Sequence, residues 1–129
     1  MRVIIFFVMY LLLFDNVYAD ELFRKTGTFS SLYYHKEAGD LLGDEIRIVV
    51  GKEKYEGTFQ SVQGEPDHLV LLENISFNGN KIEFTIPEKS IFTGKFVGRL
   101  SAYGLEGTLI LTNGVEVNLR LKRRKSYWD

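Results

Sequence analysis

The residues that could carry chemistry are few and scattered in this chain. It has no cysteine, and its two histidines are His35 and His68. Neither histidine is spaced with another histidine or a carboxylate as a site of three or four metal ligands requires. Thiol catalysis is excluded, and no serine stands in a recognisable Ser-His-acid arrangement. We therefore expect a protein that is not an enzyme and that uses no metal or cofactor.

The other polar motifs predict surface features. Asp40, Asp44 and Glu45 cluster after a glycine turn, but their spacing lacks the pattern of a calcium loop. Residues 74–76 form an Asn-Ile-Ser glycosylation sequon, so Asn74 matters as an acceptor only in a eukaryotic host.

The charge balance argues against two classes of partner. The 129 residues include 16 basic and 17 acidic side chains, for a net charge of −1. Nucleic acids and anionic membranes both favour strongly basic surfaces. We therefore expect neither nucleic acid nor an anionic membrane to be the main partner.

Residues 1–19 have the layout of a secretory signal peptide. A positive start at Arg2 is followed by the apolar run 3–14, and Val17 and Ala19 are the small residues before a cut at Asp20. The alternative is a membrane anchor, but the apolar run is shorter than the roughly 20 residues of a membrane-spanning helix. The pattern predicts a secreted or periplasmic protein with no stable membrane insertion after cleavage.

Residues 20–129 form one domain of alternating apolar and polar segments. Turn residues separate these segments, including an Asn-Gly pair at 113–114, which is a strong hairpin signal. No segment has a helical period. The predicted strands are 26–35, 44–50, 55–63, 68–77, 81–86, 91–100, 105–112 and 115–121.

The short links between these strands predict an all-β, antiparallel up-and-down meander of about eight strands. Such a meander closes most simply into a barrel, which removes the exposed edges. A β-sandwich is the alternative. The alternation loses phase near Glu73 and Asn74, which predicts a bulge there. Glycines inside the strands favour sharp coiling of the sheet, and these are Gly57, Gly94, Gly98 and Gly107.

The first predicted strand opens with Gly27-Thr28-Phe29, and arginines stand near the end of the last strand. Together with the export signal and the meander, these features resemble the calycin group, which includes lipocalins, avidins and fatty-acid-binding proteins. Lipocalins open with Gly-x-Trp, and the ring packs against an arginine from the last strand. The resemblance implies that Phe29 replaces the tryptophan and that Arg120 or Arg123 is its partner. The helix and disulfides common in lipocalins are missing.

The inward face of this barrel is apolar. An interior of eight strands is either filled by side chains or holds one small ligand. Glycines beside Phe59 and Phe96 favour a cavity, whereas the dense apolar set favours a packed core. If a cavity exists, it suits an apolar ligand, and its predicted wall includes Phe59, Phe84, Phe96, Leu109 and Leu119.

Residues 122–129 combine basic and aromatic side chains. They could form an exposed patch for an acidic partner or a glycan. Alternatively, Tyr127 and Trp128 fold back over one barrel mouth, and we favour this because the only tryptophan has a large apolar area. The predicted barrel-end cap therefore comprises Phe29, Arg123, Tyr127 and Trp128.

Two functions fit this sequence. The first is an exported, non-enzymatic binding module for a small apolar ligand held inside the barrel. The second is a protein-interaction or inhibitor module with a solid core, which binds an exported protein partner through its loops and its basic-aromatic C-terminus.

Overall fold

The computed structural model describes residues 24–129, and all regular elements in this part are β-strands. The predicted signal segment, residues 1–19, lies outside the described residues. Within the described part of the chain, no helix has the length and apolar character needed to cross a membrane. The strands are β1 (Gly27–Ser30), β2 (Tyr33–His35), β3 (Asp40–Val50), β4 (Tyr55–Pro66), β5 (Val70–Leu71), β6 (Glu73–Asn78), β7 (Lys81–Ile86), β8 (Gly94–Leu100), β9 (Gly104–Leu111) and β10 (Glu116–Arg123).

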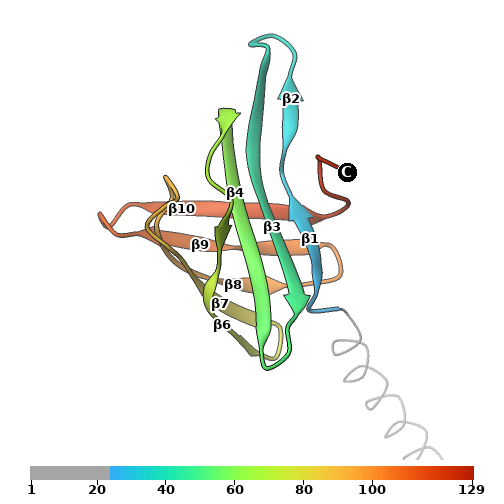
Figure 1. The fold of residues 1–129 in the computed structure, drawn as a ribbon, viewed down its shortest axis with the longest axis vertical. Coiled ribbons are helices and arrows are strands. Elements are labelled where there is room, and N and C mark those ends of the chain that lie inside the picture. The colour runs from blue at the N-terminus through green and yellow to red at the C-terminus, as the bar shows by residue number, and fades with distance from the viewer. Residues whose placement is uncertain (1–23) are drawn as a thin grey trace, which may run out of the picture.

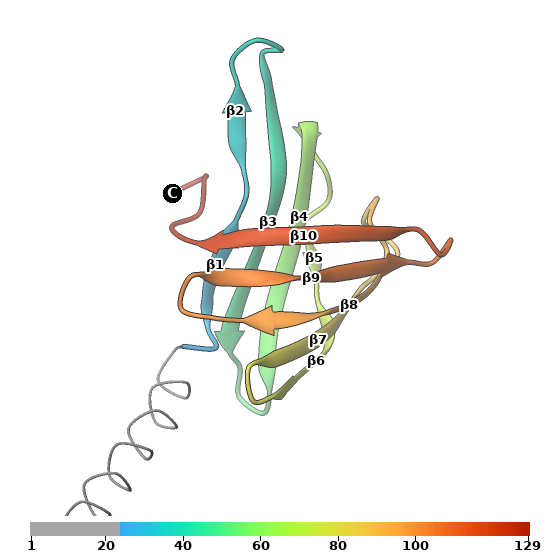
Figure 2. The same cartoon turned by 180° about the vertical axis from the view of Figure 1, so that it is seen from behind.

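The strands form one antiparallel sheet that curls into a nearly closed barrel (Figure 1). The order is β5-β4-β3-β1-β10-β9-β8-β7-β6, and β2 pairs with β3 beside this path. β1 lies between β3 and β10, so the first strand of the meander meets the last. Seen from behind, β8, β9 and β10 run across the direction of β3 and β4 (Figure 2). The predicted all-β antiparallel barrel is confirmed at this level.

A bend between β5 and β6 links the two ends of the sheet, on the other side of the barrel from the pairing of β1 with β10. β5 pairs with β4, β6 pairs with β7, and only Leu72 separates β5 from β6. The Leu72 N–H donates to the Gly57 carbonyl at 2.8 Å. A register shift between Glu73 and Ser76, with a positive φ of 53° at Asn74, marks the bulge that the sequence predicts. The predicted strand 68–77 is therefore two short strands, which pair with different neighbours.

The predicted first strand is also split in two. β1 ends at Ser30, and the Oγ of Ser31 accepts a hydrogen bond from the Asp44 N–H at 3.0 Å. β2 then continues along β3 as a hairpin that projects beyond the barrel (Figure 1). We call residues 33–42 the projecting hairpin.

The barrel interior is filled by apolar side chains from strands on opposite sides of the barrel. The Phe84 and Phe96 rings stack with their centroids 4.6 Å apart. A Cβ added at Gly98 or Gly107 would lie 2.5 or 2.7 Å from Cζ of Phe96. These two glycines therefore make room for the Phe96 ring, and they do not leave space for a ligand. The fully enclosed core includes Phe29, Ile46, Ile48, Phe59, Ile82, Phe84, Ile86, Phe96, Leu100, Leu105, Leu109 and Leu121.

Adjacent residues of β10 provide a direct test of this interior. Leu119 is only 5% exposed inside the barrel, whereas Asn118 lies on the outer face. Leu119→Asp buries an unpaired charge and should lower the free energy of unfolding by about 3–5 kcal/mol. Asn118→Asp, the matched control, should change it by no more than about 0.5 kcal/mol. Urea denaturation measures both, and equal losses would contradict the assignment of faces.

Candidate functional site

One end of the barrel is closed by an arginine that lies over a phenylalanine. Phe29 of β1 and Arg123 of β10 are paired in register. The guanidinium carbon of Arg123 lies 4.7 Å from the centroid of the Phe29 ring, within the range of a cation–π contact. Of the two arginines that the resemblance implies, Arg123 is thus the one at the ring. Arg120 lies on the outer face, where it forms an ion pair with Glu106.

The Arg123 guanidinium also donates to three backbone carbonyls, two in residues 24–26 and one in the loop between β8 and β9. Its Nη1 donates to the Thr26 carbonyl at 2.7 Å, and its Nη2 donates to the carbonyls of Arg24 and Ser101 at 2.5 and 3.1 Å. Burial of the guanidinium, with a smaller contribution from the charge of Arg24, lowers the pKa of Arg123 from its ordinary value. We call this the closed end.

Gly27 suits the closed end mainly through its backbone conformation, which other residues rarely adopt. Its φ is 143°, and a Cβ placed there would lie 2.9 Å from Nη1 of Arg123. Next to it, the ammonium of Lys25 lies 5.2 Å from the centroid of the Phe77 ring. Residues 24–26 therefore cross the end of the barrel and cover its apolar interior.

The residues predicted to line a ligand cavity are packed against one another. All five belong to a single buried cluster and none exceeds 5% exposure. The structure brings them together, but as the core of the barrel. They are Phe59, Phe84, Phe96, Leu109 and Leu119.

The predicted position of Tyr127 and Trp128 is wrong. They are 44% and 51% exposed, and the indole N–H of Trp128 donates to Oε1 of Gln60 at 3.0 Å on the outer wall. We call residues 124–129 the tail. It is held on the outer wall because the Glu45 carboxylate accepts hydrogen bonds from the Ser126 hydroxyl and from the Tyr127 N–H. Arg123 and residues 24–26 already fill the barrel end that these aromatic rings were expected to cover.

Two buried apolar side chains lie outside the main core cluster. Leu32 and Val62 are at most 1% exposed, yet neither belongs to the main core. Strand alternation places Val62 on the opposite face of β4 from Phe59. The Arg124 guanidinium donates to the Leu32 carbonyl, which ties the start of the tail to the segment between β1 and β2. Sequence alternation alone did not reveal the burial of Leu32, because the break at Ser31 changes which face each residue takes.

The opposite end of the barrel contains a hollow beside a buried carboxyl. The hollow has a volume of about 310 Å³ and is lined by residues that include Asp44, Ser61, Gln63 and Phe92. Oδ1 of Asp44 is buried and has no hydrogen-bond partner among residues 24–129. Burial raises the pKa of Asp44, and a hydrogen bond with Ser61 opposes this rise to a lesser extent.

Exposed aromatic side chains occupy the projecting hairpin. Tyr33 and Tyr34 are 50% and 54% exposed. The neighbouring His35 has a structural contact, since its Nδ1 accepts a hydrogen bond from the Ala38 N–H at 3.1 Å. The described part of the chain contains no group of three histidine, cysteine, aspartate or glutamate residues that could hold a metal.

No protein family, curated protein or solved structure matches this chain. Function must then be inferred from the structure itself, which has a nearly closed antiparallel barrel, one closed end, a polar hollow at the other end and a projecting hairpin.

Arg123 should contribute more to stability than its neighbour Arg120. Arg123→Lys removes the planar group that reaches three carbonyls and should lower the free energy of unfolding by about 1–3 kcal/mol. Arg120→Lys, on the exposed outer face, should change it by no more than about 0.5 kcal/mol. Thermal and urea unfolding measure both variants. Similar losses would show that the closed end does not depend on the guanidinium.

Asp44 should make stability depend on pH. A raised folded-state pKa means that the folded protein loses stability as pH rises through that pKa, because the carboxylate ionises more easily once unfolded. Asp44→Asn should therefore raise the unfolding temperature at pH 7. The gain should vanish as the pH falls below 3.8, the ordinary value for aspartate. Asp40→Asn, an exposed control, should shift the unfolding temperature little at any pH.

Proposed function

We propose that this protein is an exported, non-enzymatic interaction module that binds a protein partner through the projecting hairpin. In this proposal the barrel is a calycin-type scaffold with a solid core. The observation that carries the proposal is the contrast between an interior filled by side chains and a hairpin with exposed aromatic rings and an open strand edge.

One open edge of the sheet belongs to β2, in the projecting hairpin. Among the described residues β2 pairs only with β3, so the backbone groups on its other side have no strand partner. An extended peptide can add to such an edge, with main-chain hydrogen bonds supplying affinity and side-chain contacts supplying specificity. Tyr33 and Tyr34 alternate on the two faces of this strand, so each face of an added strand would meet one tyrosine.

A small apolar ligand inside the barrel has less support. Such a ligand would have to separate the stacked rings of Phe84 and Phe96, which are at most 1% exposed. Close packing in protein interiors makes this displacement costly. The hollow at Asp44 is also unsuited to an apolar ligand, because its lining includes two aspartates, a serine and a glutamine.

Site-specific photo-crosslinking in the exported fraction tests the proposal. A benzophenone amino acid placed at Tyr34 should form one discrete protein adduct. The same substitution at Tyr103, which is 89% exposed on the loop between β8 and β9, is a matched aromatic control and should form none. Adducts at both positions in equal yield, or at neither, would overturn the proposal.

A further inference from the structure

A second surface lies on the outer wall near the closed end, away from the projecting hairpin. It is a groove of about 510 Å³ between β8, β9 and β10. Its lining combines exposed polar side chains with the buried Leu100, Leu105 and Leu121. The exposed lining residues that matter here are Arg99, Ser101, Tyr103, Arg120 and Lys122. The groove plays no part in the proposed partner binding.

Strand register concentrates positive charge beside this groove. Lys81 pairs with Arg99, Arg99 with Glu106, and Glu106 with Arg120, so the four form one row across β7, β8, β9 and β10. Lys122 follows on the same face of β10. All five side chains are exposed. Four cations thus accompany one carboxylate, although the chain as a whole carries a net charge of −1.

The single carboxylate neutralises only one of these cations. Oε2 of Glu106 lies 3.1 Å from Nη2 of Arg120 and 3.2 Å from its Nε. Arg99, on the other side of Glu106, forms no ion pair with any described residue. Lys81 and Lys122 likewise form none within residues 24–129. The row therefore offers unneutralised positive charge to an anionic ligand.

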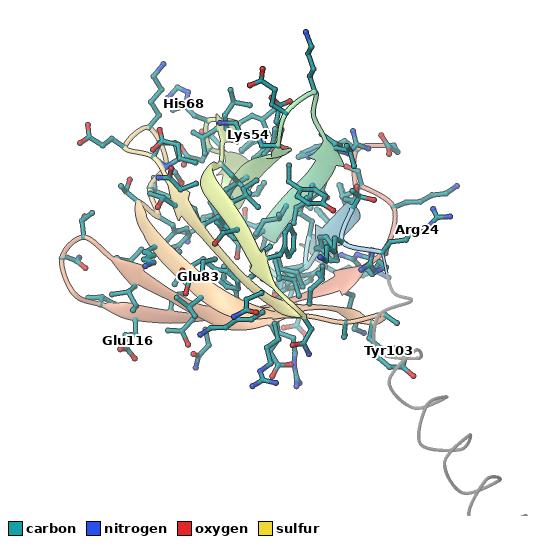
Figure 3. The ribbon with its side chains drawn as sticks, turned by 90° about the horizontal axis from the view of Figure 1, so that it is seen from below. Arg24, Lys54, His68, Glu83, Tyr103 and Glu116 are labelled. Atoms are coloured by element: carbon teal, nitrogen blue, oxygen red, sulfur yellow. The ribbon has the colours of Figure 1, made fainter. Side chains whose placement is uncertain are left out.

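A flat aromatic ring stands beside the basic row. Tyr103 is 89% exposed and projects away from the barrel (Figure 3). Its backbone is nevertheless fixed, because its N–H donates to Oγ of Ser101 at 3.2 Å and its carbonyl accepts from the Arg123 N–H at 2.8 Å. An exposed ring on a fixed loop can pack against the apolar face of a sugar without a large loss of conformational entropy.

We propose that this groove binds an anionic polysaccharide. Arg99 and Arg120 lie two strands apart, so their backbones are separated by about 10 Å. This separation suits a polymer with repeated acidic groups better than a single small anion. A peptide strand is disfavoured in the groove because β8 and β9 are paired on both sides, and β10 is paired with β9 along its length and with β1 at Lys122 and Arg123. An anionic bilayer would need apolar side chains to insert, and the row itself contains none.

Titration calorimetry with heparin, a sulfated polysaccharide, tests the proposal at low ionic strength. The native protein should bind heparin and should not bind neutral dextran. The double substitution Arg99→Gln with Arg120→Gln should weaken binding about tenfold or more. The substitution Lys52→Gln with Lys54→Gln removes the same charge from the exposed turn between β3 and β4. This matched control should weaken binding less than about threefold.

Further variants distinguish heparin binding at a defined site from nonspecific electrostatic attraction. Tyr103→Ala should weaken heparin binding while leaving its salt dependence unchanged, because it removes an uncharged contact. All variants alter exposed side chains, and their unfolding temperatures check that they remain folded. Equal losses from the arginine and lysine pairs would overturn the proposal. Absence of heparin binding, or binding only to vesicles of anionic lipid, would also overturn it.

Discussion

The contact between Arg123 and Phe29 reinforces the short seam where the first strand of the meander meets the last. β1 and β10 share only two residue pairs, whereas β3 and β4 share ten. The Arg123 side chain reinforces this short seam by reaching the carbonyls of Thr26, Arg24 and Ser101. A charged group bonded to several carbonyls over an aromatic ring is costly to disrupt once buried. We therefore expect the junction between β1 and β10 to depend strongly on this side chain.

In both proposals a solid barrel places recognition on the outside of the molecule. The apolar side chains that could have lined a cavity instead stabilise the fold, which has no disulfide to support it. The projecting hairpin and the basic groove then lie on different parts of a rigid scaffold. Each can bind a ligand without any change in the core, so the two proposed activities are physically independent.

Much of the fold could be predicted from the sequence, because alternation with period two is a local signal. The meander, the hairpin turns and the bulge near Asn74 all follow from it. The position of Trp128 could not be predicted, since it depends on Glu45, which is distant in sequence and accepts hydrogen bonds from the tail. Strand alternation placed Phe96 and Gly98 on one face of β8 but gave no sign that the Phe96 ring lies over Gly98 and its partner Gly107, because alternation does not fix the direction of a ring along the sheet.

Native mass spectrometry of the protein, purified without detergent from the exporting cells, tests the solid interior most directly. A core in which Phe84 and Phe96 stack leaves no room for a lipophilic molecule. The account predicts the mass of the polypeptide alone, at low and at high collision energy. A stoichiometric apolar adduct that is retained through purification and released on unfolding would contradict it.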